Sequence, residues 1–90
     1  MADTATARIR AVITGRPTAA YVEVLADDVA AVCESVPEAN RTPVVLALHK
    51  GARGAPVKIN GDGERVPCPV HIEAGKLAQI LEAAPGGNAQ

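Results

Sequence analysis

A continuous apolar run, Val44–Leu48, is the feature that most restricts how this chain can fold. It lies inside the stretch Thr42–Lys50, which reads T-P-V-V-L-A-L-H-K. Because its apolar residues follow one another without polar residues between them, a strand formed here would be covered on both faces. We therefore expect a central strand, and we expect the other segments to pair beside it or to pack on it.

Three further segments have the alternation of half-buried strands. Residues 5–14 place apolar side chains on one face, with Val12 adding apolar surface to the other. Residues 57–60 and 65–72 alternate in the same way, and Gly61–Gly63 between them predicts a hairpin turn. Proline has no amide hydrogen for a ladder, so the prolines at 67 and 69 predict an edge strand.

Residues 18–36 fit two patterns. In the first, six apolar residues fall on one arc of a helix of roughly 120°, with Val24 alone misplaced. In the second, a short strand from Ala19 to Leu25 precedes a helix capped by Asp27 or Asp28. We favour the long helix on the number of matching positions. Residues 73–84 predict a final amphipathic helix.

The resulting order is β-α-β-β-β-α. It predicts an α+β two-layer sandwich, in which two amphipathic helices cover one face of a small, mainly antiparallel four-stranded sheet. We expect a single domain over residues 5–84, with disordered ends at 1–4 and 85–90. The expected core comprises Val22, Leu25, Val29, Cys33, Val36, Val44, Leu46, Leu48, Ile59, Val70, Leu77, Ile80 and Leu81.

The core has almost no aromatic residues to draw on. The chain has 90 residues, 48% of them hydrophobic, yet Tyr21 is its one aromatic residue. A small aliphatic core gains stability when further surface is buried against a partner. We therefore expect a homo-oligomer or a complex with another protein.

The residue types of metal and catalytic sites do not occur here in productive patterns. Cys33, His49, Cys68 and His71 lack the close pairs of a zinc site, and Cys33 falls on the apolar arc of the expected helix. Neither cysteine has neighbours that would lower its pKa and make it a nucleophile. We expect no metal, no cofactor and no enzymatic activity.

Composition also bounds the setting of the protein. Two cysteines and no signal segment favour a reducing compartment, so we expect a cytoplasmic protein, or a virion component if the source is viral. No apolar run is as long as a membrane span. Heavy use of Ala, Val, Arg and Gly indicates a high-GC bacterial or viral source.

One segment has the composition of an anion site. Residues 49–58 carry His49, Lys50, Arg53 and Lys58 around two glycines, and glycine lets a backbone approach an anion closely. Arg65 and His71 could reinforce it from the next strand. The competing interpretation is a solvated loop, which the net charge of -1 favours.

Two functions remain for the chain. The first is a small non-enzymatic module for protein interaction or assembly, such as an accessory subunit or a viral structural or host-interaction protein. The alternative is nucleic-acid or phosphate-ligand binding through residues 49–58. Against the alternative stands the lack of aromatic residues, on which single-strand binders stack bases.

Overall fold

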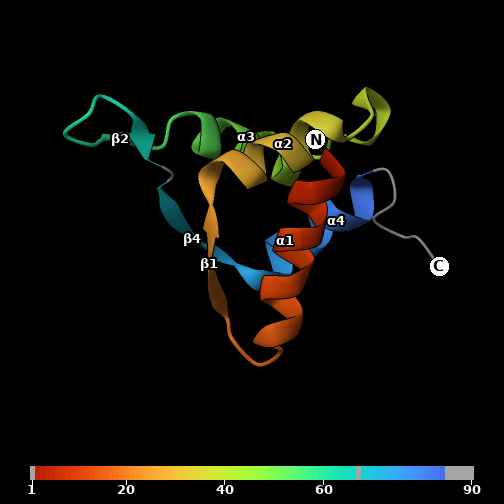
Figure 1. Ribbon diagram of the computed structural model, residues 1–90. Helices are drawn as coiled ribbons and strands as arrows, with labels where there is room; N and C mark the ends of the chain where they lie inside the picture. The colour runs from red at the N-terminus through yellow and green to blue at the C-terminus, as the bar shows by residue number, and fades with distance from the viewer. Residues whose placement is uncertain (1, 67, 85–90) are drawn as a thin grey trace.

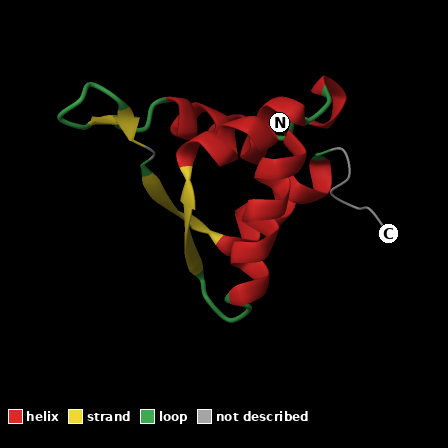
Figure 2. Cartoon of the chain, in the orientation of Figure 1, coloured by secondary structure: helices red, strands yellow, loops and turns green. Residues whose placement is uncertain are grey.

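Four α-helices, one 3-10 turn and two pairs of short antiparallel strands make up residues 2–66 and 68–84, which the computed structural model describes. Figures 1 and 2 show their arrangement. In chain order they are α1 (Ala2–Gly15), β1 (Tyr21–Leu25), α2 (Ala26–Ser35), η1 (Glu38–Asn40), α3 (Pro43–Arg53), β2 (Lys58–Ile59), β3 (Arg65–Val66), β4 (Pro69–Glu73) and α4 (Ala74–Ala83). The α+β class is confirmed. The expected four-stranded sheet is replaced, within these residues, by two separate strand pairs.

The pair β1–β4 forms one wall of the core. Ala74 N donates to Ala20 O at 2.9 Å and Ala26 N donates to Cys68 O at 3.2 Å, which fixes the register between these two bonds. The alternation of the strand then turns Val22 and Val24 inward. Pro69 stands opposite Leu25, between hydrogen-bonded pairs, so the amide hydrogen that it lacks would have pointed away from β1.

The second pair, β2–β3, is the hairpin that the glycines at 61 and 63 predict. The side-chain Oδ1 of Asn60 accepts from the backbone N of Asp62 and of Glu64, at 2.9 Å each. Gly63 has a φ of 83°, which a residue with a Cβ rarely adopts. In Figure 1 the hairpin follows α3 and projects from the helical body.

The core lies between the helices and the inner face of β1–β4. It draws on α1 through Ala5 and Ile9, on α3 through Val45, and on α4 through Leu77 and Ile80. Each of these side chains is nearly or fully buried. Helix α2 contributes the buried residues Val29, Val32 and Cys33. No helix in the described ranges is long and apolar enough to span a membrane.

The predicted central strand at 44–48 is wrong, because these residues form the first half of α3. Thr42 caps this helix and Pro43 occupies its first turn, which is a helix start rather than a strand start. Val45, Leu48 and Ala52 then face inward at helical spacing. The apolar run was continuous because it crosses the buried and exposed sides of one helix, and Leu46 is 54% exposed.

Two other predicted elements are also corrected. Residues 5–14 form most of α1, since Ala5, Ile9 and the half-buried Val12 and Ile13 follow the helical period. In residues 18–36 the long helix that we favoured is wrong, and the alternative of a strand followed by a helix is confirmed. The expected cap is wrong, because the helix begins at Ala26 with Leu25 as its N-cap, and Asp27 and Asp28 lie within its first turn. Val24, the residue that the long helix left misplaced, is buried as the inward residue of β1.

The core was predicted in part. Most expected members are buried or half-buried, but Leu46 on α3 and Ile59 on β2 are exposed. The buried Ile9 and Val45 were missing from the expected core because their segments were read with the strand period. The final helix, α4, is confirmed with buried Leu77, Ile80 and Leu81. Helix α1 begins at Ala2, within the segment expected to be a loose end, and the expected tail at 85–90 lies outside the described residues.

Candidate functional site

Helix α3 presents an exposed side beside the hairpin. Its eleven residues begin at the Thr42 cap, where Thr42 Oγ1 accepts from Val45 N at 3.3 Å. With Val45 turned into the core, Leu46, Ala47 and Lys50 face outward. The helix contains no acidic residue. We call the exposed residues of α3 and of both faces of the hairpin the α3–hairpin surface; it comprises Leu46, Ala47, Lys50, Arg53, Lys58 and Arg65, with Lys58 and Arg65 on opposite faces of the hairpin.

The predicted anion-site residues fall on two elements. His49, Lys50 and Arg53 lie in the last turns of α3, and Lys58 opens β2. The stretch expected to be a flexible loop is therefore largely helical, with Gly51 inside α3 and Gly54 as its C-cap. Three of the four candidate side chains are therefore positioned by a helix. The expected glycine loop, whose backbone would surround an anion, is not formed.

Glu34 of α2 contacts two of these residues, His49 and Arg53. His49 Nε2 lies 3.1 Å from Glu34 Oε2, and Arg53 forms an ion pair with the same oxygen. The hydrogen bond from His49 and the positive charge of Arg53 together lower the pKa of Glu34 from its ordinary value. Glu34 is therefore a carboxylate at neutral pH, and it neutralises part of the positive charge of α3.

Asp27 of α2 holds the hairpin in a similar way. The Arg65 guanidinium donates to both carboxylate oxygens of Asp27, at 2.8 and 3.0 Å. This bidentate geometry is the strongest form of an arginine–carboxylate contact. Arg65 thus links β3 to the first turn of α2.

The two lysines have no such partners. Among the described residues, no hydrogen bond or ion pair involves the side-chain ammonium group of Lys50 or of Lys58. Lys58 stands opposite Val66, whereas Ile59 stands opposite Arg65, so Lys58 and Arg65 emerge from opposite faces of the hairpin. Lys50 is therefore the cation most directly presented by the α3–hairpin surface.

The sequence patterns missed several parts of this arrangement. The spacing of Leu46, Lys50 and Arg53 is helical and could have shown that they lie on neighbouring positions of one helix. The pairing of Asp27 and Glu34 with α3 and the hairpin had no local signal, because the partners are far apart in sequence. His71, considered as a reinforcement, lies on β4 with Nε2 3.7 Å from Glu23 Oε2.

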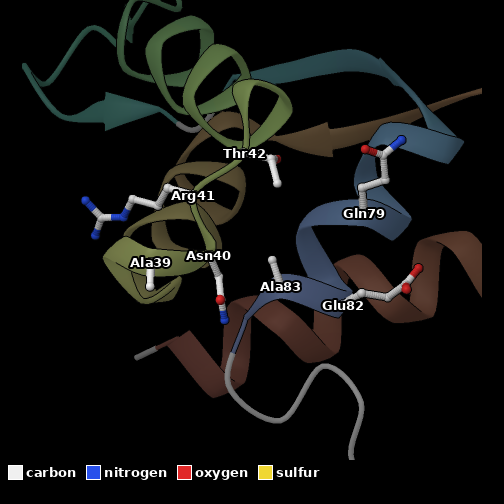
Figure 3. A pocket seen from close by; sticks show the side chains of 7 residues that line it. All are labelled: Ala39, Asn40, Arg41, Thr42, Gln79, Glu82 and Ala83. Carbon is white, nitrogen blue, oxygen red and sulfur yellow. The ribbon is translucent and has the colours of Figure 1, made fainter.

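A groove lies between α4 and the segment before α3. This groove of about 550 Å³ is lined by Ala39, Asn40, Arg41, Thr42, Gln79, Glu82 and Ala83. Arg41 donates to the carbonyl oxygens of Val36 at 3.0 Å and Glu34 at 3.4 Å, and in Figure 3 its side chain extends away from α4. Its ionisable lining residues are Arg41 and Glu82.

Cys33 and His49 line one small pocket, but in the described part of the chain they do not belong to a metal-binding set. Among the described residues no three His, Cys, Asp or Glu side chains are placed to share a metal ion. Burial raises the pKa of the Cys33 thiol to about 11, with the neighbouring charge of Glu34 acting in the same direction. Cys33 is therefore a neutral core side chain rather than a nucleophile.

Comparisons of the chain with protein-family models, with curated proteins and with solved structures found no match.

Proposed function

We propose that this protein binds duplex nucleic acid through the α3–hairpin surface. One observation carries the proposal: a pair of packed helices, α2 and α3, is followed directly by a hairpin, and the exposed side of the second helix has a lysine and no carboxylate. Two packed helices in succession resemble a helix-turn-helix unit, whose second helix enters the major groove. The resemblance is one of arrangement, and the connection over residues 36–42 is longer than the usual turn.

The dimensions and side chains of α3 suit a groove. Eleven residues give a helix about 16 Å long, and a major groove about 12 Å wide admits one helix. Ala47 and Gly51 add little bulk to the exposed side, so the helix backbone could approach base edges closely. Thr42 and Pro43 place the amino end of the helix, which is favourable for phosphate contact, at the surface.

Duplex nucleic acid is favoured over a single strand. Single-strand binders stack bases on aromatic rings, and the α3–hairpin surface has none. The one aromatic residue of the chain, Tyr21, is exposed on β1.

A salt titration tests the proposal. If Lys50 and Lys58 each neutralise one phosphate, the slope of log K against log salt is about -1.8, so affinity for a duplex falls about 12-fold between 50 and 200 mM salt. Replacing Lys50 with Ala is expected to weaken binding and to reduce the slope by about 0.9. Fluorescence anisotropy with a labelled duplex measures both quantities.

The matched control is Lys76→Ala. Lys76 lies on α4, where it pairs with Glu73 at 3.0 Å, so this variant removes the same charge from another element. It is expected to leave the affinity and the slope close to those of the wild type. Absence of duplex binding at 50 mM salt, or equal effects of the two lysine variants, would refute the proposal.

A second candidate function is a protein-interaction or assembly module. Leu46, Val57 and Ile59 on α3 and around the hairpin are large apolar side chains exposed to solvent, and such side chains anchor protein interfaces. This function predicts a complex that depends on Leu46 and Ile59 and that weakens little with salt. A pull-down with the wild type and with Leu46→Ser, washed at 50 and at 500 mM salt, separates it from nucleic-acid binding.

A further inference from the structure

Helix α2 carries two carboxylates on one exposed side. Asp27 and Glu34 are two helical turns apart, about 10 Å along the axis, with Ala31 between them on the same side. Each carboxylate pairs with an arginine of the α3–hairpin surface: Asp27 with Arg65, and Glu34 with Arg53. Both arginines of this surface are thus paired with carboxylates of α2.

These pairs are exchangeable. The side chains of Arg53 and Arg65 are more than half exposed, and so is Asp27, while Glu34 is 44% exposed. Ion pairs at such sites are weak because water screens them and because two long side chains must be held in place. A phosphate group can therefore compete for either arginine, but it has to displace a carboxylate that is already in contact.

We infer that Asp27 and Glu34 are specificity-determining residues, which suppress the sequence-independent attraction of the α3–hairpin surface to polyanions. The inference rests on the proposed function. Phosphate attraction is common to all nucleic acids, whereas base contacts discriminate between sequences. With both arginines neutralised, binding depends more on the exposed side of α3, through Leu46, Ala47 and Lys50, and on contacts that only a fitting duplex can make.

The opposite role for these carboxylates is to orient the arginines toward phosphates. Bidentate contact between Asp27 and Arg65 would fix the guanidinium plane and lower the entropy lost on binding. The two roles predict opposite effects of neutralising the carboxylates. If the carboxylates compete with phosphate, neutralising them strengthens nucleic-acid binding. If they orient the arginines, neutralising them weakens it.

The test compares Asp27→Asn, Glu34→Gln and the double variant with the wild type. Binding to a duplex of random sequence is measured between 50 and 200 mM salt, and elution from heparin is measured in parallel. Each single substitution is expected to tighten duplex binding at 50 mM salt by about two- to fivefold, the range of one exposed ion pair. It also makes the slope of log K against log salt steeper by about 0.9, since one more arginine contacts a phosphate. The double variant elutes latest from heparin.

Glu38→Gln is the matched control. It changes the net charge by the same amount, but Glu38 lies in η1 and makes no ion pair with α3 or the hairpin in the described residues. We expect its affinity and slope to remain those of the wild type. Circular dichroism on all variants checks the fold, and Glu34→Gln alone suffices if Asp27→Asn does not fold.

The outcomes separate the two proposals. If the wild type binds duplex in a Lys50-dependent manner, but Glu34→Gln and Asp27→Asn behave like Glu38→Gln or bind more weakly, this inference is wrong and the proposed function stands. If neither the wild type nor any variant binds duplex or heparin at 50 mM salt, both are wrong.

Discussion

Asp28 is the one buried charged residue in the part of the chain that the structure describes, and Arg8 is its partner. The Asp28 side chain is about nine-tenths buried on α2, and Arg8 on α1 donates to its Oδ1 at 2.9 Å. A buried carboxylate that loses its partner keeps the cost of its desolvation. The pair therefore links α1 to α2. If it is lost, the main energetic cost is that of a buried Asp28 carboxylate without its partner.

Replacing Arg8 with Ala is expected to lower the free energy of unfolding by about 1 to 3 kcal/mol. In the background of Asp28→Asn, where no charge is left to compensate, the same replacement should cost much less. Urea denaturation of the four proteins in this cycle measures the difference. Equal costs in the two backgrounds would show that the ion pair contributes nothing.

Cys33 links stability to alkaline pH. Burial raises the pKa of its thiol from 9.0 to about 11, so the unfolded chain loses this proton at a lower pH than the folded protein. The stabilisation that comes from the raised pKa of Cys33 is therefore fully present below pH 9, and it is lost as the pH rises toward 11. We expect the free energy of unfolding to fall by on the order of 2 kcal/mol over this interval from Cys33 alone.

The control for this dependence is a pair of alanine variants. Cys33→Ala should lose that part of the alkaline slope, whatever its stability at pH 7, while Cys68→Ala should keep it. Urea midpoints at pH 8, 9, 10 and 11 give the slopes. A Cys33→Ala slope equal to that of the wild type would contradict the assignment.

At the scale of the element, the amino end of α3 decides the conformation of its segment. Thr42 accepts from Val45 N at 3.3 Å and satisfies one of the orphan amide groups of the first turn. Thr42→Ala is expected to cost about 1 kcal/mol of stability, and Thr42→Ser should retain most of it because serine keeps the accepting oxygen. Thermal unfolding by circular dichroism compares the three proteins. A Thr42→Ala variant as stable as the wild type would mean that this bond contributes no stability.

The same segment shows what the residue pattern could and could not predict. The hairpin turn and the final helix were predicted correctly, since the glycines at 61 and 63 and the spacing of Leu77, Ile80 and Leu81 are local signals. The single edge strand expected over residues 65–72 is wrong, because β3 (Arg65–Val66) pairs with β2 whereas β4 (Pro69–Glu73) pairs with β1. Residues 44–48 were assigned the wrong element because a short apolar run fits a buried strand and a helix equally well. The Thr42-Pro43 helix start was the signal that would have decided between them.

The sequence identified the residues of the candidate site but not how they are arranged in space. The sequence predicts His49, Lys50, Arg53 and Lys58 as site residues, but it predicts a loop where α3 continues to Arg53. The contacts of Arg53 with Glu34 and of Arg65 with Asp27 depend on how distant segments pack, which no local pattern records. The charge balance of the α3–hairpin surface could therefore be known only from the fold.

At the scale of the whole molecule, the leucines differ in how much they contribute to stability, because Leu77 is buried and Leu46 is exposed. Leu77→Ala is expected to cost about 2 to 5 kcal/mol, because Leu77 is fully buried at the centre of the core. Leu46→Ala should change stability by less than about 0.5 kcal/mol, since its side chain is 54% exposed. Urea denaturation of both variants tests the assignment of residues 43–53 to a helix. A cost for Leu46→Ala similar to that for Leu77→Ala would instead favour a buried strand.

Because the aliphatic core is small, we predict that the protein forms a homo-oligomer or a stable complex with another protein. Almost all of the buried side chains are Val, Ile, Leu and Ala, while Tyr21, Leu46, Val57 and Ile59 stay exposed. A dimer would bury part of this apolar surface and would present two copies of α3 to one duplex, which strengthens binding without any new contact. Because association stabilises the folded state by mass action, the melting temperature is expected to rise with protein concentration. Light scattering coupled to size exclusion should then give a mass of at least two chains at high concentration. A monomer mass at every concentration, with a melting temperature that does not change on dilution, would show that this small aliphatic core is stable by itself.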